Sequence, residues 1–246
     1  MGSVCITGGS RGIGRDLALA FAEAGYKVFV GARNASGIRD AAPGIAFVEM
    51  DVRDDAGHDR LVAEAMAATG RLDCYINNAG VSAWRPIGEI DAAFLDDMLA
   101  VNLKGAFWGC KAAAGALGAG GSIINISSLA AKRGTANNAA YCAAKFGMTG
   151  LTQAMSKELG PRGIRINAIC PVLVRTPGLI DALKDPKSPA KGDPDAFLEG
   201  FAATQSALGR LPTGAEVAAM ALYLASDAAS GVTGQSINVD CGVLPQ

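Results

Sequence analysis

Seven short runs rich in β-branched and aromatic residues recur along the chain, and alanine-rich, helix-like stretches separate them. The runs cover residues 3–7, 27–31, 45–50, 72–77, 122–127, 164–169 and 236–240. Such alternation is typical of βαβ units, whose strands run parallel and are covered by helices on both faces of the sheet. Because no low-complexity linker interrupts the pattern, the sequence predicts one α/β domain over residues 1–246 with a doubly wound parallel sheet.

Residues 175–209 depart from this alternation. The segment holds four prolines and most of the local charge. A connection of this length in a compact domain is usually functional and carries some helix of its own. We expect it to form a lid over a substrate site.

Composition narrows the classes of partner. The net charge of −1, without a basic cluster, offers no footprint for nucleic acid or an anionic membrane, so we expect small-molecule partners. No stretch is long and apolar enough to span a bilayer, and the first residues resemble neither a signal nor a transit segment, which favours a cytoplasmic protein. The 50% apolar and 18% charged content indicates further burial in a homo-oligomer.

Residues for metal or triad chemistry are few. Six cysteines are scattered without CxxC spacing, most of them inside apolar runs, and indicate reduced core thiols. The single histidine, His58, lies in a polar, helix-like stretch. We therefore expect neither a metal site nor a Ser-His-Asp triad.

A glycine-rich stretch, TGGSRGIG at residues 7–14, follows the first strand-like run and leads into a helical stretch. Gly8, Gly12 and Gly14 permit a tight turn and a close approach of backbone N–H groups to a diphosphate. The spacing is GxxxGxG and not GxGxxG, so the pattern alone also fits an ordinary glycine-rich turn. Its position between strand and helix favours dinucleotide binding.

The end of the second run indicates which dinucleotide fits. An NAD site normally offers a carboxylate to the ribose 2′-hydroxyl there, whereas arginine accommodates the 2′-phosphate of NADP. This chain has Ala32 and Arg33 at that point, and Arg11 can approach it from the glycine turn. Charge-assisted bonds from two guanidinium groups favour NADP(H). The alternatives are an NAD site and a solvated Arg33.

Tyr141 and Lys145 stand four residues apart in the stretch YCAAKFG. On a helix, side chains at this spacing are neighbours. A phenol beside an ammonium is suited to proton transfer, although a packed ring and a snorkelling lysine stem would show the same pattern.

Four motifs in order settle the choice: TGGSRGIG, NNAG at 77–80, ISS at 126–128 and YCAAK at 141–145. From residue 3 to about 242 the chain resembles the short-chain dehydrogenase/reductases. The resemblance implies a Rossmann-type sheet of seven strands and a nicotinamide-dependent interconversion of alcohol and carbonyl. It also implies a catalytic tetrad of Asn102, Ser128, Tyr141 and Lys145. Helices that carry residues 109–117 and 141–148 would pack a tetramer.

The same resemblance implies the residues that hold the cofactor. Asp51 and Val52 would lie near adenine, and Val174 near the nicotinamide amide. The full expected set is Gly8, Ser10, Arg11, Gly12, Ile13, Gly14, Arg33, Asp51, Val52, Asn78, Ala79, Gly80, Tyr141, Lys145, Val174 and Thr176.

The roles of the tetrad follow from its chemistry. A free tyrosine has a pKa of about 10 and is a poor base at neutral pH. A lysine cation about 4 Å away stabilises the phenolate by roughly 4 kcal/mol before desolvation is subtracted, which lowers the tyrosine pKa by up to about three units. We expect Tyr141 to exchange the proton, Ser128 to bind the carbonyl oxygen, and Asn102 to anchor a water. The cofactor supplies the hydride.

The substrate stays open. We expect a small or medium free carbonyl or secondary alcohol, with an NAD-dependent sugar or polyol dehydrogenase as an alternative. A 3-oxoacyl-carrier-protein reductase is a further alternative, for which only Arg162 and Arg165 offer docking cations. A non-catalytic nucleotide-binding regulator is a different class. Lys132 and Arg133 either receive an anionic substrate or are solvated loop charges.

Two departures from the family pattern concern the backbone. Val172 follows Pro171, and Cys241 precedes Gly242, at places where the family usually has glycine. Val172 should avoid positive φ, so we expect the backbone beside the nicotinamide to differ slightly.

Overall fold

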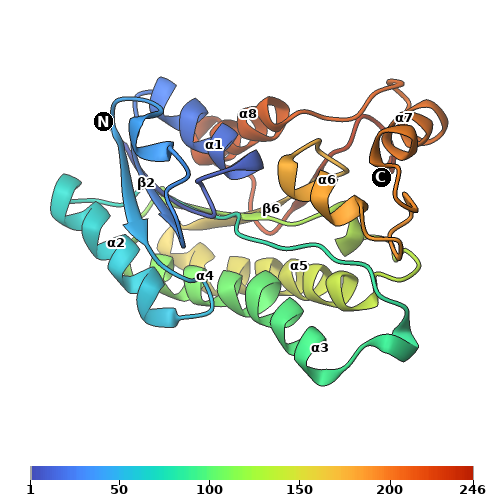
Figure 1. Ribbon diagram of the computed structural model, residues 1–246. Helices are drawn as coiled ribbons and strands as arrows, with labels where there is room; N and C mark the ends of the chain where they lie inside the picture. The colour runs from blue at the N-terminus through green and yellow to red at the C-terminus, as the bar shows by residue number, and fades with distance from the viewer. Residues whose placement is uncertain (1, 246) are drawn as a thin grey trace.

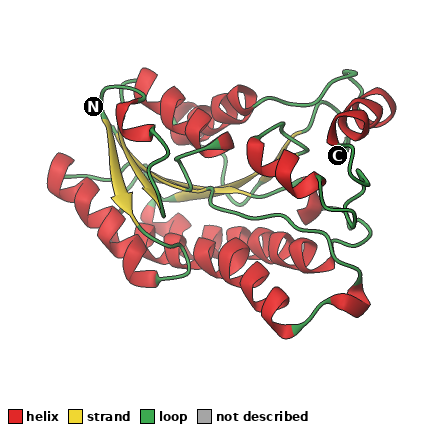
Figure 2. Cartoon of the chain, in the orientation of Figure 1, coloured by secondary structure: helices red, strands yellow, loops and turns green. Residues whose placement is uncertain are grey.

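The computed structural model describes residues 2–245, and they form one parallel sheet of seven strands between two layers of helices (Figures 1 and 2). The strand order is β3-β2-β1-β4-β5-β6-β7. The strands are β1 (Ser3–Thr7), β2 (Lys27–Ala32), β3 (Ile45–Glu49), β4 (Cys74–Asn77), β5 (Ser122–Ile126), β6 (Arg165–Pro171) and β7 (Ser236–Val239). Strands β2 and β3 are added on one side of β1, and β4 to β7 are added on the other side. The switch point therefore lies between β1 and β4, where doubly wound folds bind ligands at the carboxyl ends of the strands. The predicted Rossmann-type fold is confirmed.

Helices cover both faces of the sheet. On one face lie α1 (Gly12–Glu23) and α8 (Gly214–Ala225), which pack against each other; on the other lie α2 (Asp55–Thr69), α4 (Gly105–Ala116) and α5 (Ala139–Leu159) (Figure 1). Helix α3 (Ala92–Leu99) packs beside α5. Within the described chain no helix is long and apolar enough to cross a membrane.

Alternate residues of the strands supply two separate cores. Val4 and Ile6 of β1 pack in the core that includes Leu17 of α1, whereas Cys5 packs with Leu61 of α2 on the opposite face. Successive side chains of a strand point to opposite faces, and here both faces are buried. This explains why the strand-like runs are almost continuously apolar.

The 175–209 segment carries helix of its own, as the sequence predicts. It forms α6 (Pro177–Leu183) and α7 (Pro194–Gln205) beyond the carboxyl end of β6. Leu183 and Leu198 of this segment pack with Trp84 from the connection that follows β4. Lys187 pairs with Glu89 of the same connection.

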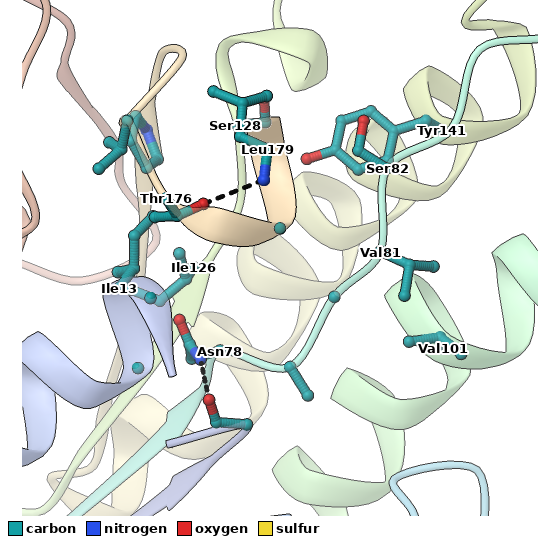
Figure 3. A pocket seen from close by; sticks show the side chains of 18 of the residues that line it. Ile13, Asn78, Val81, Ser82, Val101, Ile126, Ser128, Tyr141, Thr176 and Leu179 are labelled. Carbon is teal, nitrogen blue, oxygen red and sulfur yellow. Dashed lines mark hydrogen bonds between the residues drawn. The ribbon is translucent and has the colours of Figure 1, made fainter. Parts of the chain in front are cut away.

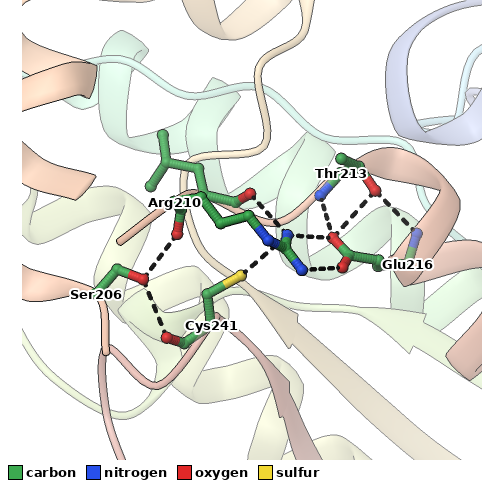
Figure 4. Close-up of polar contacts among 6 residues, drawn as sticks. Ser206, Arg210, Thr213, Glu216 and Cys241 are labelled. Carbon is green, nitrogen blue, oxygen red and sulfur yellow. Dashed lines mark hydrogen bonds and ion pairs between the residues drawn. The ribbon is translucent and has the colours of Figure 1, made fainter. Parts of the chain in front are cut away.

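A polar network holds the C-terminal end of the segment (Figure 4). The Ser206 Oγ donates to the Cys241 carbonyl oxygen at 3.0 Å, and Arg210 pairs with Glu216 at the start of α8 at 2.6 Å. Cys241 adopts φ 55°, the left-handed conformation for which glycine is usual. At Val172, where the family usually has glycine, the backbone avoids positive φ, as expected. The next residue, Leu173, has a positive φ of 41° instead.

Candidate active site

A cleft of about 860 Å³ opens at the carboxyl ends of the strands and receives nearly every residue that the sequence singles out (Figure 3). Of the predicted tetrad and cofactor-binding residues only Asn102 does not line it, and the candidate substrate or docking cations Lys132, Arg162 and Arg165 do not line it either. Those that line the cleft are Gly8, Ser10, Arg11, Gly12, Ile13, Gly14, Arg33, Asp51, Val52, Asn78, Ala79, Gly80, Ser128, Tyr141, Lys145, Val174 and Thr176. Segments that lie far apart in the sequence thus meet in one place.

The turn between β1 and α1 requires glycine at particular positions. Gly8 and Gly12 have φ values of 65° and 54°, which side chains rarely adopt. A Cβ on Gly14 would overlap the Gly8 carbonyl oxygen and the Asn78 side-chain amide. The turn is therefore a close-packed backbone cradle and not a loose glycine-rich loop.

The N-terminus of α1 has N–H groups to offer. Its N-cap residue, Arg11, makes no side-chain capping bond, and no acidic residue lies in its first turn. An aspartate or threonine side chain caps α2, α3, α6, α7 and α8, whereas α4 and α5 share the absence of a side-chain cap with α1. Uncapped N–H groups and the helix dipole form an anion site, so this end of α1 fits a dinucleotide diphosphate.

Hydrogen bonds from Asn78 and Ala79 join the ends of β1 and β4 at the switch point. The Asn78 side-chain amide donates to the Thr7 carbonyl oxygen at 3.0 Å and to the Gly8 carbonyl oxygen at 3.2 Å, the second of which Figure 3 shows. The Asn78 backbone N–H donates to the Thr7 Oγ1 at 3.1 Å. The Ala79 N–H donates to the same hydroxyl at 3.2 Å. These bonds hold the NNAG stretch against the glycine turn.

At the β2 end of the cleft the charges are distributed unevenly. Arg53, which sequence reasoning missed, lies 2.6 Å from Asp51 and 3.1 Å from Asp97. Its guanidinium hydrogen bonds hold the pKa of the Asp51 carboxyl below the ordinary value. Arg11 and Arg33 form no ion pair or side-chain hydrogen bond within residues 2–245. Both guanidinium groups are thus free to bind a ligand, although the charge of Arg33 also acts on Asp51 and that of Arg11 on Asp181.

The pair Tyr141 and Lys145 lies on one face of α5, as their spacing predicts. The Lys145 Nζ is 5.6 Å from the centre of the Tyr141 ring and donates to the Ile126 carbonyl oxygen at 3.0 Å. Lys145 is 3% exposed although it lines the cleft. An ammonium has three donors, so two remain for a ligand.

The protonation of this pair depends on its burial. Burial raises the pKa of Tyr141 from 10.0 to about 12, and hydrogen bonding by Ser128 opposes the rise. Burial lowers the pKa of Lys145 from 10.5 to about 8. Desolvation thus sets the pKa of both groups, and the lowering of the tyrosine pKa by Lys145 stays a prediction.

Ser128 lies just beyond β5, and the Tyr141 hydroxyl points into the cleft on the side of this serine (Figure 3). The Ser128 Oγ accepts a hydrogen bond from the Ala130 N–H at 3.1 Å. Ser127 also lines the cleft and is buried. Of the two serines, Ser128 is the one whose hydroxyl counters the rise in the Tyr141 pKa.

Asn102 lies behind the wall of the cleft, in a π-helical turn (Ala100–Lys104) between α3 and α4. Its Oδ1 accepts from the Val81 N–H at 3.1 Å, and its Nδ2 donates to the Met98 carbonyl oxygen at 3.0 Å. A Cβ on Gly80 would stand 2.9 Å from this Oδ1 and 3.7 Å from the Lys145 Nζ. Asn102 therefore holds the chain after β4, and it lies close to the lysine.

The β5–β6 end of the cleft has an apolar wall that the sequence did not reveal. Its large side chains come from the chain after β4, the end of β6 and the 175–209 segment, namely Trp84, Leu173, Leu179, Phe197 and Phe201. Trp84 is 6% exposed and lines the cleft as well as packing in the core of the 175–209 segment. No local pattern distinguishes these residues from ordinary core.

A phosphate cradle at the switch point, beside a tyrosine, a serine and a lysine, defines a dinucleotide-dependent oxidoreductase that acts on CH–OH or C=O groups. A family model described as enoyl-(acyl carrier protein) reductase matches residues 8–244. The chain belongs to the short-chain dehydrogenase/reductase family.

Individual relatives span almost the whole chain. L-2,3-butanediol dehydrogenase of Corynebacterium glutamicum is 35% identical and covers 97% of each chain. A 3-oxoacyl-[acyl-carrier-protein] reductase of Staphylococcus aureus is 32% identical and covers 98% of this chain and 97% of the relative. The crystal structure of a variant actinorhodin polyketide ketoreductase with NADPH has a TM-score of 0.89 and 30% identity, covering 98% of this chain and 97% of that one. A nicotinamide cofactor follows from this kinship.

Proposed function

We propose that the protein is an NADP(H)-dependent oxidoreductase that interconverts a carbonyl and a secondary alcohol on a small or medium free substrate. The observation that carries the cofactor choice is that the guanidinium groups of Arg11 and Arg33, at the end of β2 where the adenosine ribose belongs, make no ion pair or hydrogen bond within residues 2–245. A 2′-phosphate gains charge-assisted hydrogen bonds from these guanidinium groups. The ketoreductase that the chain resembles was crystallised with NADPH.

The residues of the cleft divide the chemistry between them. A bound nicotinamide supplies the hydride. Tyr141 donates its proton to the carbonyl oxygen during reduction and takes it back during oxidation, while Ser128 hydrogen-bonds the same oxygen as charge develops there. The two free donors of Lys145 hold the ribose of the cofactor.

The protonation of Tyr141 favours one direction of the reaction. With a pKa of about 12, the phenol keeps its proton at neutral pH and is ready to act as an acid. Carbonyl reduction needs that acid, whereas alcohol oxidation needs the phenolate. We therefore expect reduction to proceed at neutral pH and the rate of oxidation to rise as the pH increases, while the concentrations of substrate and cofactor set the net direction.

The carrier-protein alternative finds little support in the cations that would dock such a partner. Arg165 is 8% exposed, and its guanidinium donates to the carbonyl oxygens of Leu224 and Ser226 at 2.6 and 3.2 Å. Only Arg162 remains exposed at this edge. A free substrate is therefore preferred, although relatives include both a carrier-linked reductase and a diol dehydrogenase.

Titration of the purified protein with NADPH and NADH, followed by cofactor fluorescence, tests the cofactor choice. NADPH should bind more tightly, and Arg33→Ser should weaken NADPH by roughly ten- to one-hundredfold while it changes NADH by less than about threefold. Arg39→Ser is the matched control, because Arg39 stacks on Phe47 and does not line the cleft. Tighter binding of NADH by the wild type would favour the NAD-dependent alternative.

We also propose a homo-oligomer. Phe107 of α4 and Phe146 of α5 are 48% and 47% exposed on the outer helical layer, which is unusual for large aromatic side chains. Light scattering should give a mass that is a multiple of the chain mass. A monomer at micromolar concentration would contradict this proposal.

A further inference from the structure

Arg133 is a cation without a counter-ion at the substrate end of the cleft. It lies in the loop between Ser128 and α5, and its backbone N–H donates to the Leu129 carbonyl oxygen at 3.1 Å. Its side chain lines the cleft and makes no hydrogen bond or ion pair within residues 2–245. The neighbouring Lys132 instead donates to the Ser236 carbonyl oxygen at 2.7 Å and does not line the cleft.

The surroundings of Arg133 offer nothing to neutralise it. The carboxylates that line the cleft, Asp51 and Asp97, lie at the opposite end and are paired with Arg53. Leu129, which bonds the Arg133 backbone, packs in an apolar cluster with Leu173 and Phe201, and all three line the cleft. A guanidinium next to a low-dielectric wall gains most from an anionic partner that enters with an apolar body.

A second polar group in the same loop also lacks a partner. Asn138, three residues before Tyr141, is 6% exposed and lines the cleft, and its Oδ1 has no hydrogen bond within the described residues. Its Nδ2 lies 3.4 Å from the Thr135 Oγ1. Since that hydroxyl can donate as well as accept, the amide can turn over and offer its N–H groups to a ligand. The loop thus holds a free guanidinium and a buried amide with an unsatisfied polar atom, and both residues line the cleft.

We propose that the substrate carries a carboxylate on an apolar or aromatic body and that Arg133 binds this carboxylate. The inference rests on the proposed function, since it names the substrate class for the same cleft. The planar fork of arginine matches a carboxylate with two parallel hydrogen bonds. The apolar body lies against the wall that Trp84 and Phe201 provide.

A matched pair of ketones tests the anchor. The probes are 4-acetylbenzoate and 4-acetylbenzamide, which have the same shape and differ in charge. Wild-type enzyme with its preferred cofactor should show kcat/KM roughly ten- to one-hundredfold higher for the acid. Arg133→Met should bring the ratio of the two kcat/KM values close to one, whereas Lys132→Met removes a charge from the adjacent position and should keep the wild-type ratio.

A binding measurement separates failure of the anchor from failure of the proposed function. The unreactive pair 4-ethylbenzoate and 4-ethylbenzamide is compared by the shift in melting temperature of the enzyme with NADP⁺. A larger shift with the acid, lost in Arg133→Met, supports the anchor even if neither ketone is reduced, and that lack of turnover would count against the proposed function alone. Equal shifts and equal kcat/KM values in the wild type would overturn the anchor.

Discussion

The two ends of the cleft are built in different ways. At the cofactor end the backbone forms the surface: the turn from Gly8 to Gly14, the uncapped start of α1, and the bonds between Thr7 and Asn78. At the substrate end side chains form it, and they come from the chain after β4, the loop after β5 and the 175–209 segment. A diphosphate is bound by a few contiguous N–H groups, whereas a carbon skeleton is bound by the shape that distant segments make together.

Of the variants considered, Tyr141→Phe should have the largest effect: it should lower turnover strongly and leave cofactor binding nearly unchanged. Removal of the hydroxyl should reduce turnover by about 10³-fold or more, the range of general acid–base catalysis, while the cofactor affinity stays within about threefold. Initial rates and cofactor fluorescence measure the two effects. Retained turnover would rule out Tyr141 as the proton donor.

Gly14→Ala should break the cofactor end alone. The new Cβ would overlap the Gly8 carbonyl oxygen, so the cradle must open, with an expected loss of about 2 kcal/mol in the free energy of unfolding and a cofactor affinity at least roughly tenfold weaker. Gly200→Ala is the control: Gly200 is exposed in α7 with open space around its Cα, and alanine there should add about 0.5–1 kcal/mol. If both variants bind cofactor like the wild type, the cradle does not bind the diphosphate.

Lys145→Met should stabilise the fold while it abolishes activity. The unfolded lysine has a pKa near 10.5 and the folded one about 8, so the unfolded chain binds more protons between these values and stability rises with pH across that window. Below pH 8 the fold carries the cost of a buried ammonium. Methionine should therefore add about 1–3 kcal/mol at pH 7 and less at pH 10, as measured by denaturant unfolding.

Tyr141 makes the free energy of unfolding fall with pH, whereas Lys145 makes it rise, and the fall occurs at higher pH. Its folded pKa of about 12 exceeds the unfolded value of 10.0, so its contribution to stability is fully present below pH 10 and is lost as the pH rises to 12.

For the Lys145→Met variant, a free energy of unfolding that equals that of the wild type at every pH would contradict the desolvation of Lys145.

Glu89→Gln should have the smallest effect, at the substrate end. Glu89 and Lys187 join the 175–209 segment to the chain after β4, with side chains 51% and 42% exposed. An exposed pair contributes less than about 1 kcal/mol and is weakened by salt. Unfolding measured at low and high salt should show a difference that disappears at 1 M salt, with KM within about twofold of the wild type. A large rise in KM would show that this pair positions the segment.

Prediction from sequence succeeded where the signal is local. The strand at residues 3–7, the glycine turn after it and the four-residue spacing of Tyr141 and Lys145 are each contained within one short stretch. It failed for the π-helical turn around Asn102, since the hydrogen bonds of that turn depend on Val81 and Met98 packed against it. It also missed Arg53 and treated Arg165 as a docking cation, because ion pairing and burial are set by distant residues.

The sequence by itself determined the sheet, the cofactor cradle and the family, because the periodicity of apolar residues and the conformational demands of glycine act over a few residues. Only the tertiary structure decided the protonation of Tyr141 and Lys145, the shape of the substrate end and the choice of Arg133 over Lys132 as its free cation. These properties depend on desolvation and on partners supplied by other segments. Neither exists until the chain has folded.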